Sequence, residues 1–256
     1  MIHPTAQVSP GAALGERVSV GPYAVIGEGV RIGDGTSVGA HCVLEGPTTI
    51  GRDNRIFPFC SLGAEPQDKK YSGEPTRLEI GDRNTIREFC TFNRGTAQDA
   101  GVTRLGDDNW IMAYVHLAHD CQVGNGTVFA NNASLAGHVH IGDQVILGGF
   151  TGVHQFVKVG AHAITGIASV VLQDVPPYVT AAGNPAQPHG INQEGLKRRG
   201  FEPQAVARIR AAYKTLYRSG LGFEEAKRAI REQSAAEPAL GILAAFLDTV
   251  TRGIIR

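Results

Sequence analysis

The chain has 256 residues, of which 42% are hydrophobic, so it suits one large globular domain or two unequal ones. Lys plus Arg and Asp plus Glu number 24 each, and this balance offers no global basic field for nucleic acid or an acidic membrane surface. The N-terminus "MIHPTAQVSP" has no basic segment followed by an apolar run, and no stretch approaches the roughly 18 apolar residues of a membrane span. We therefore expect a cytoplasmic protein with no nucleic-acid partner and no membrane span.

A repeat of six residues dominates the first two thirds of the chain. Its aliphatic position is often followed by Gly, as in "IGEGVR" and "IGDGTS", and its fifth position is small or branched. The repeat returns at Ile80, Ile86 and Phe92 and then continues from Leu105 to Val171, with Thr165 as the one exception. The first run comprises Ile2, Val8, Leu14, Val20, Ile26, Ile32, Val38, Leu44, Ile50, Ile56 and Leu62.

A period of six fits neither a helix nor an ordinary half-buried strand, but short strands joined by tight turns would produce it. Three hexapeptides close a triangular coil of eighteen residues, with the aliphatic and fifth residues inward, and coils stack about 4.8 Å apart as parallel strands. The sequence therefore predicts an all-β solenoid. It resembles the left-handed parallel β-helix of the hexapeptide acyltransferases, and only that resemblance implies the left hand, because the general crossover rule favours right-handed turns.

Two insertions interrupt the repeat, and such insertions loop out on one side of a solenoid and often serve binding. The first is "AEPQDKKYSGEPTR", residues 64–77. In the second, thirteen residues separate Phe92 from Leu105 where six or twelve would keep the period, so residues 95–104 hold the excess. We expect the first loop, the more polar of the two, to be the functional one; the alternative is a solvated excursion.

Prolines near residues 176–188 mark the end of the repeat, and helix-forming residues follow. "EPQAVARIRAAYKTLYRSG" predicts an amphipathic helix whose buried face comprises Val206, Ile209, Ala212, Tyr213 and Leu216. "FEEAKRAIREQ" and "EPALGILAAFLDTVTRGI" predict two further helices. We therefore expect a β-helix over residues 1–186 and a small C-terminal α-helical domain over residues 187–256.

The four cysteines, Cys42, Cys60, Cys90 and Cys121, all occupy the inward fifth position, which indicates a packing role. Cys42 and Cys60 are eighteen residues apart and should stack in adjacent coils, close enough for a disulfide, although a cytoplasmic compartment favours free thiols. No Cys-x-x-Cys pair suggests zinc.

The eighteen-residue period turns "HLAHDCQVGNGTVFANNASLAGHV", residues 116–139, into a rough map. Adding eighteen places His119, Gly137 and Gln155 in one column and Asp120, His138 and Phe156 in the next. His116 and His154 lie nearby, so four histidines gather outside the inward positions. We expect ordinary packing or solvation for the other histidines, His3, His41, His140, His162 and His189.

An outward histidine beside an aspartate and under a glycine has the parts needed for acyl transfer. His119 can accept a proton near neutral pH, Asp120 can fix its tautomer, and the Gly137 N–H can stabilise a thioester oxyanion. Metal binding is the competing use of such a cluster.

Several motifs together resemble one family closely. "LAHDCQVGN", "NNASLAGHV", "GGFTGVHQF", "QDVPPYV", "GNPA" and above all "NQEGLKRRGF" are similar to the UDP-N-acetylglucosamine O-acyltransferases of lipid A biosynthesis. The similarity covers nearly the whole chain and includes both the "QDKKYSGEPTR" loop and the helical tail. It implies transfer of an (R)-3-hydroxyacyl chain from acyl carrier protein to the 3-hydroxyl of UDP-N-acetylglucosamine.

The resemblance also implies residue roles. His119 matches the general base, Asp120 its supporting carboxylate, and Gly137 the residue whose N–H serves the oxyanion. The positions that match substrate-binding residues are Gln67, Asp68 and Lys70 in the first loop, His116, His138, His154 and Gln155 around the base, and Asn192, Glu194, Arg198 and Arg199 in "NQEGLKRRGF". That last set suits a nucleotide-sugar clamp, that is, a set of side chains that binds the nucleotide sugar, because an arginine guanidinium can donate two parallel hydrogen bonds to phosphate oxygens. The alternative is a basic first turn of a solvated helix.

The resemblance also implies a homotrimer with active sites in the clefts between subunits. Such a cleft would explain why polar residues line the outer edge of a solenoid that has no deep pocket of its own. No metal and no nucleotide cofactor are expected, because phosphopantetheine arrives on the acyl carrier protein.

Two positions depart from relatives. Asn93 stands where some carry His, which puts an auxiliary histidine role there in doubt. Ile167 stands where relatives that take longer chains carry Gly, so we expect its side chain to act as the acyl-chain ruler. Each buried methylene is worth only roughly 0.8 kcal/mol, whereas a steric wall rejects a longer chain outright. We therefore expect a donor of about ten to twelve carbons.

Three other readings remain open. Another hexapeptide acyltransferase, using acetyl-CoA or performing a later N-acylation, is disfavoured by "NQEGLKRRGF". A γ-class carbonic anhydrase-like zinc enzyme would use three interface histidines. A purely structural solenoid would leave the polar cluster and the loops without a role.

Overall fold

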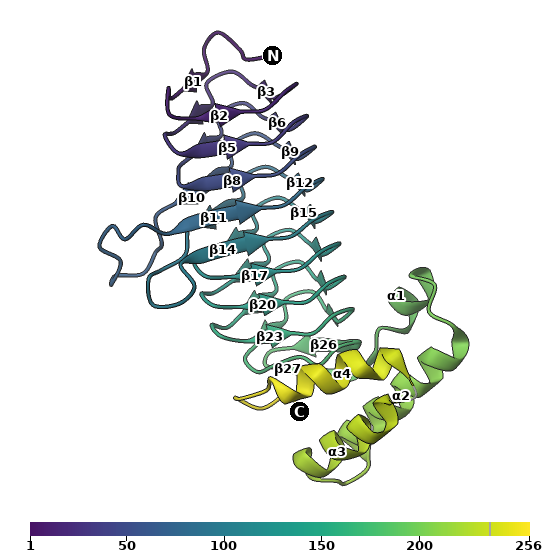
Figure 1. Ribbon diagram of the computed structural model, residues 1–256. Helices are drawn as coiled ribbons and strands as arrows, with labels where there is room; N and C mark the ends of the chain where they lie inside the picture. Colours follow the sequence, from purple (N-terminus) through teal and green to yellow (C-terminus); the bar gives the residue numbers. More distant parts are fainter. Residues whose placement is uncertain (236) are drawn as a thin grey trace.

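The computed structural model describes residues 1–235 and 237–256 and shows a long triangular solenoid with helices at its C-terminal end (Figure 1). Each coil contributes one short strand to each of three sheets, so strands pair with every third strand along the chain. Nearly all the pairs are parallel, and the solenoid is a left-handed parallel β-helix, as the sequence predicted. None of the described helices has the length and apolar character needed to cross a membrane.

The chain passes from sheet I to sheet II to sheet III in each coil. Sheet I contains β1 (Gln7–Val8), β4 (Val25–Ile26), β7 (Val43–Leu44), β10 (Ser61–Ala64), β13 (Thr91–Asn93), β16 (His116–Leu117), β19 (Ser134–Leu135), β22 (Gly152–Val153) and β25 (Val170–Val171). Sheet II contains β2 (Ala13–Leu14), β5 (Val30–Ile32), β8 (Thr48–Ile50), β11 (Arg77–Ile80), β14 (Val102–Leu105), β17 (Gln122–Val123), β20 (His140–Ile141) and β23 (Lys158–Val159). Sheet III contains β3 (Ser19–Val20), β6 (Ser37–Val38), β9 (Arg55–Ile56), β12 (Thr85–Ile86), β15 (Trp110–Ile111), β18 (Val128–Phe129), β21 (Ile146–Leu147), β24 (Ile164–Thr165), β26 (Val179–Gly183) and β27 (Ala186–Ile191).

The inward positions are those that the repeat predicted. The aliphatic residue of each hexapeptide enters the core, where Leu44, Leu117 and Leu135 are fully buried. The small fifth residue fills the corner behind it, and all four cysteines are buried there as free thiols.

Corner residues carry an unusual backbone. The second residue of most corners has a positive φ although it is not glycine, as at Asp120 (60°), His138 (62°) and Phe156 (65°). This conformation costs about 1 kcal/mol in a residue with a β-carbon, but stacking offsets it because each N–H donates to the coil before: His138 N to His119 O at 3.0 Å and Phe156 N to Gly137 O at 3.1 Å.

Register locates the two insertions. Strands pair with residues eighteen positions away, as in Gln7 with Val25, until the first loop, residues 65–76, makes Leu62 pair with Phe92. The second loop, residues 94–101, makes Phe92 pair with Leu117. Both loops leave sheet I and enter sheet II, so they project from the same edge on consecutive coils (Figure 1).

The helical part comprises α1 (Gln193–Arg198), α2 (Pro203–Arg218), α3 (Phe223–Ser234) and α4 (Pro238–Asp248). The predicted apolar face of α2 is buried at all five positions; Val206, Ile209, Ala212 and Leu216 join a second hydrophobic cluster, whereas Tyr213 joins the core of the solenoid. The second cluster includes Tyr178 of the last coil, whose hydroxyl donates to Ala239 O at 2.8 Å. The boundary expected between residues 186 and 187 falls inside the terminal β26–β27 hairpin.

Candidate active site

The corner between sheets I and II, called corner I/II below, gathers most of the predicted site. Residues 118–121 join β16 to β17, residues 136–139 join β19 to β20, and residues 154–157 join β22 to β23. The two insertion loops occupy the same corner in the two coils that precede His119. The stacking map is thus confirmed, and both loops stand next to the predicted base.

His119 and Asp120 form a hydrogen-bonded pair, with the imidazole Nδ1 2.9 Å from Asp120 Oδ2. Asp120 is fully buried, and Thr96 donates to its carboxylate from the backbone N–H, at 2.9 and 3.0 Å to the two oxygens, and from the hydroxyl at 2.6 Å. Burial pushes the pKa of Asp120 upward, but the hydrogen bonds from His119 and Thr96 outweigh it and leave the pKa below its ordinary value. A carboxylate accepts, so His119 carries its proton on Nδ1 and presents Nε2 as an acceptor.

Gly137 provides the space that the His119 ring occupies. A β-carbon on Gly137 would stand 2.5 Å from Cε1 and 2.7 Å from Nε2 of His119, closer than real contacts allow. Among the described residues, the Gly137 N–H donates no hydrogen bond. A free N–H therefore lies beside the acceptor nitrogen of the base.

His138 lies among four neighbours. Its Nδ1 lies 2.8 Å from Asp99 Oδ2 and 3.8 Å from Asp120 Oδ2. Its ring stacks on Phe156 with centroids 4.4 Å apart and meets His119 edge to face at 5.0 Å. The map placed His138 over Asp120, but its hydrogen-bond partner is Asp99, a residue of the second loop.

His116 and His154 flank a shallow groove on the outer face of sheet I. Thr91 Oγ1 lies 2.7 Å from His116 Nδ1, and burial lowers the pKa of His116. His154 is exposed, as is its neighbour Gln155. The groove, of about 410 Å³, is mostly apolar and is lined by His116, Ala118, Ser134, Leu135, Ala136, Gly152, Val153, His154, Val170 and Leu172.

The cluster could also hold a cation. Ligand atoms of His119, Asp120 and His138 lie within 4.8 Å of one another, and no other described group of three such side chains does so. Two histidines and one carboxylate are a possible zinc set. However, Asp120 Oδ2 already receives hydrogen bonds from Thr96 and His119, so a metal would have to replace bonds that the fold supplies.

The first loop stands beside the site but does not touch the base pair. Gln67 and Lys70 are exposed, and Asp68 accepts a hydrogen bond from the Lys70 N–H at 3.0 Å. Buried Arg94 fastens this loop to the second one by donating to Gly63 O at 2.9 Å and to the Tyr71 hydroxyl at 3.0 Å. The second loop contacts His138 and Asp120 directly, and the functional role expected for the first loop stays a prediction.

Asn93 is buried next to these loops. Its side-chain amide donates to Glu65 O at 3.0 Å, so it joins the two loops rather than the base.

The residues of "NQEGLKRRGF" lie at a different corner, where sheet II passes to sheet III. Arg199 donates to Gln144 Oε1 at 2.8 Å and to Gln144 O at 2.9 Å, and Gln144 joins β20 to β21. Asn192 is the N-cap of α1 and accepts from the Gly195 N–H at 3.1 Å, while Glu194 and Arg198 are exposed. The structure therefore does not bring this set to His119 within one chain.

Ile167 lies at the third corner, where sheet III passes to sheet I, and is 76% exposed. It lies beside Gly149, where an added β-carbon would be 3.9 Å from Ile167 Cγ1. Sheet I, with its apolar groove, separates this corner from His119.

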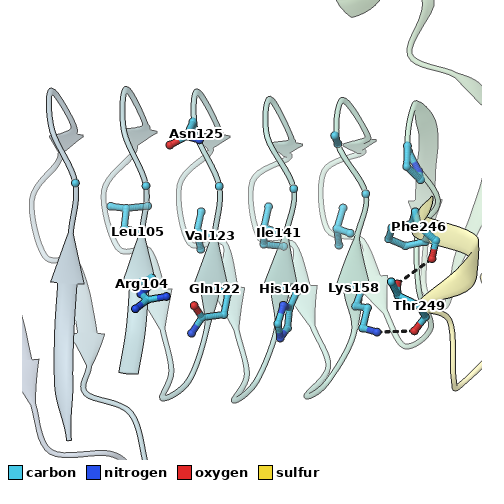
Figure 2. Close-up of a pocket in the computed structure, with 18 of the residues that line it drawn as sticks. Arg104, Leu105, Gln122, Val123, Asn125, His140, Ile141, Lys158, Phe246 and Thr249 are labelled. Atoms are coloured by element: carbon cyan, nitrogen blue, oxygen red, sulfur yellow. Dashed lines mark hydrogen bonds between the residues drawn. The ribbon is translucent and has the colours of Figure 1, made fainter. Parts of the chain in front are cut away.

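The largest groove, about 1,070 Å³, lies elsewhere, on the outer face of sheet II under α4 (Figure 2). Arg104, Gln122, His140 and Lys158 form a ladder along it, one residue per coil (Figure 2). Its cations are already paired, since Arg104 Nε donates to Glu79 at 2.7 Å and Lys158 Nζ to Thr249 O at 2.5 Å. We therefore place the chemistry at corner I/II.

Comparisons with known proteins show the family of this chain. A family model described as Udp N-acetylglucosamine O-acyltransferase, Domain 2, matches residues 174–255, and a bacterial transferase hexapeptide model matches residues 11–46 and 103–137. Acyl-[acyl-carrier-protein]--UDP-N-acetylglucosamine O-acyltransferases from Verminephrobacter eiseniae and Thiobacillus denitrificans are each 64% identical to the chain, with 100% of the chain and 99% of the relative covered. The chain belongs to the UDP-N-acetylglucosamine O-acyltransferase family.

Solved structures of family members superpose over the full length. LpxA from Acinetobacter baumannii matches with a TM-score of 0.97 at 46% identity, covering 100% of this chain and 99% of that one. The enzyme from Moraxella catarrhalis matches with a TM-score of 0.98 at 44% identity and the same coverage. The protein is therefore an O-acyltransferase.

Sequence reasoning missed three residues that hold the side chains of this candidate site. Thr96 holds Asp120, Asp99 holds His138, and Thr91 contacts His116. The period offered a signal for the first two, because the excess residues of the second loop had to fall in the coil next to His119. It could not show which side chains of an irregular loop turn back toward the solenoid.

Proposed function

We propose that this enzyme transfers an (R)-3-hydroxyacyl chain from acyl carrier protein to the 3-hydroxyl of UDP-N-acetylglucosamine, the first step of lipid A biosynthesis, with His119 as general base. The observation that carries the proposal is the hydrogen-bonded pair of His119 and buried Asp120, with the His119 ring packed against Gly137, whose N–H has no hydrogen-bond partner among the described residues. The sugar nucleotide and the carrier protein come from the names of relatives at 64% identity.

The proton moves between three groups in this mechanism. His119 Nε2 takes the proton of the sugar 3-hydroxyl as that oxygen attacks the thioester carbon. Asp120 supports the imidazolium that results, because its carboxylate accepts from Nδ1. When the tetrahedral intermediate collapses, the C–S bond breaks and His119 returns the proton to the departing phosphopantetheine thiolate.

The negative charge that develops on the thioester oxygen needs a donor already in place. The Gly137 N–H is such a donor, since it belongs to a rigid corner and has no partner among the described residues. Loss of one such donor costs about a hundredfold to a thousandfold in kcat in other acyl-transfer enzymes.

Sugar-nucleotide binding is assigned to two sets of residues. Gln67, Asp68 and Lys70 present polar groups beside the base corner, and His138, His154 and Gln155 continue the wall above it. Glu194 and Arg198 are exposed and free to meet the nucleotide, whereas Asn192 and Arg199 also hold the fold through Gly195 and Gln144.

A homotrimer would unite these sets, because the clamp and the base occupy different corners of one solenoid. The third corner and sheet I carry an exposed apolar stripe that suits burial against a second subunit, with rings stacked about 5 Å apart. The stripe comprises Tyr23, Val25, His41, Val43, Phe59, Phe89, Tyr114, Phe150 and Ile167.

The acyl chain is assigned to the apolar groove on sheet I, which begins at His116 and His154 beside the base. In this assignment Ile167 blocks the acyl chain where it leaves the groove at the next corner. Its side chain acts as a steric wall and limits the donor to about ten to twelve carbons. The roughly 0.8 kcal/mol gained for each buried methylene would not set such a limit.

The mechanism needs no metal and no nucleotide cofactor, since the base, the oxyanion donor and the phosphopantetheine thioester supply every step. The proposed compartment is the cytoplasm, where the four free thiols would remain reduced.

The test is mass spectrometry of products after the protein is mixed with UDP-N-acetylglucosamine and (R)-3-hydroxyacyl carrier proteins of graded chain length. A mono-acylated sugar nucleotide that is lost in His119→Ala is the expected result. Asp108→Asn serves as the matched surface control, because Asp108 pairs only with exposed Arg83 on another corner. No product with any chain would overturn the assignment and direct attention to metal analysis.

A further inference from the structure

A second histidine–carboxylate pair stands next to the first. Asp99 reaches from the second loop to His138, with Oδ2 2.8 Å from the imidazole Nδ1. His138 is 9% exposed and meets the His119 ring edge to face, with centroids 5.0 Å apart. Asp99 therefore contacts the imidazole of His138, which in turn packs against the imidazole of His119.

The second loop is fastened so that Asp99 arrives in one orientation. Thr96 anchors the loop by donating its N–H and hydroxyl to buried Asp120. Asp99 Oδ1 accepts from the Ala100 N–H at 2.8 Å, which leaves Oδ2 for His138. One eight-residue loop thus contacts the carboxylate of the base pair and the imidazole on the coil above it.

Asp99 completes a cage around His138. Phe156 covers one face of the His138 ring with centroids 4.4 Å apart, His119 meets it at 86°, and the hydrogen bond to Asp99 restrains rotation of the ring about the Cβ–Cγ bond. A carboxylate only accepts, so the proton of a neutral His138 sits on Nδ1 and Nε2 is an acceptor. Without Asp99 nothing else within hydrogen-bond range among the described residues selects that tautomer.

We propose that Asp99 is a positioning residue of the acyl-transfer reaction, which fixes the Nδ1–H tautomer and the ring orientation of His138 and, through that ring, the orientation of His119. The proposal rests on the proposed function of the His119 corner. Asp99 contacts no substrate in this role; it acts through His138 alone.

The first arm of the test reads the tautomer in the free enzyme. Long-range ¹H–¹⁵N spectra of histidine-labelled protein should show His138 as the Nδ1–H form in the wild type and in Asp99→Asn, whose amide oxygen still accepts. Asp99→Ala should give a mixture of tautomers. An unchanged His138 tautomer in Asp99→Ala would overturn the proposal, whatever the activity.

The second arm reads turnover. Asp99→Ala should lower kcat about tenfold to a hundredfold, because a support of the catalytic group is lost. KM for the sugar nucleotide should change by a smaller factor than kcat, because His138 lines the proposed sugar-nucleotide wall but keeps its side chain. Asp99→Asn should stay within about threefold of wild type, since a neutral acceptor is roughly half as strong as a charged one. Asp108→Asn, which removes a surface carboxylate, should match wild type.

A third arm separates a direct role from one through His138. In a His138→Asn background, which tolerates the positive φ of this position, Asp99→Ala should cause no further loss of kcat. An additive loss would contradict the proposal. If wild type forms no acylated product, the proposed function fails, while the tautomer spectra still decide whether Asp99 fixes His138.

Discussion

Single residues at the base corner are fixed by their neighbours before any substrate binds. Asp120 is fully buried yet keeps a low pKa, because Thr96 and His119 donate to it. Gly137 has room for no β-carbon, because the His119 ring fills that space. Preorganised groups of this kind need little rearrangement as charge develops.

Gly137→Ala should lower kcat by about a hundredfold while the protein stays folded. The new methyl group would overlap His119 Cε1 and Nε2 and move the base from its position, and a displacement of about 1 Å can cost this much. Steady-state kinetics and circular dichroism measure the two properties. Gly241→Ala in α4, where a β-carbon meets nothing within 4 Å, is the control and should keep full activity. Unchanged kcat in Gly137→Ala would show that the ring has room to move.

Ile167→Gly should shift the preferred donor to longer acyl chains. The side chain is 76% exposed at the corner beyond the apolar groove, so its removal opens the path without leaving a core cavity. Competition among carrier proteins loaded with graded chains, read by mass spectrometry, measures the change. Ile242→Gly, an exposed residue of α4, is the comparison for the loss of an exposed isoleucine. An unchanged chain preference in Ile167→Gly would contradict the ruler.

His162 should make stability depend on pH. Burial, assisted by the nearby Arg199 cation, lowers its pKa from the usual 6.5 to about 4. The unfolded chain therefore takes up a proton first, and the stability contribution is present above about pH 6.5 and is lost as the pH falls toward 4. Between these values the free energy of unfolding should fall about 2 kcal/mol further in wild type than in His162→Asn. Urea denaturation at several pH values across this range measures the free energy of unfolding of both proteins. The same pH dependence in wild type and His162→Asn would contradict the prediction.

At the scale of elements, columns of like residues stabilise the corners. Buried Asn54, Asn84 and Asn109 form a ladder in which each side-chain oxygen accepts from the next coil. The side-chain amides continue it, with Asn109 Nδ2 2.9 Å from Asn84 Oδ1. The insertion loops are elements of another kind, since Thr96 and Arg94 fasten them to coils and to each other.

Asn84→Ala should lower the free energy of unfolding by about 2–4 kcal/mol, because it leaves buried donors of Asn109 without an acceptor. Thermal or urea unfolding measures the loss. Asn131→Ala, at an exposed corner position, should cost less than about 0.5 kcal/mol. If both substitutions lowered the free energy of unfolding equally, the asparagine ladder would contribute no more stability than a single exposed corner residue.

At the scale of the molecule, one chain holds the base and the clamp on different corners. Co-expression of His119→Ala with Arg198→Ala, each inactive alone, should therefore restore activity in mixed trimers. In every trimer that contains both variants, one site of the three receives an intact base from one subunit and an intact clamp from the next, so about a third of the sites should be competent. Turnover of doubly tag-purified mixtures measures this fraction. Complete inactivity of the mixture would show that one subunit supplies both groups.

The period of six predicted much of this architecture without tertiary information. It indicated the inward residues, the coil of eighteen and the alignment of His119, Gly137 and Gln155, because a solenoid turns sequence spacing directly into stacking. The apolar face of α2 followed from helical spacing in the same way. The left hand did not follow from spacing, and rested on resemblance to known relatives.

The sequence by itself determined what repeats, namely the core, the columns and the corner that carries the base. Only the tertiary structure decided that Asp99 and Thr96 hold His138 and Asp120, and that Arg199 lies at another corner against Gln144. The physical reason is that an irregular loop or a terminal helix has no period, so its side chains are placed by hydrogen bonds and packing with coils far away in the sequence.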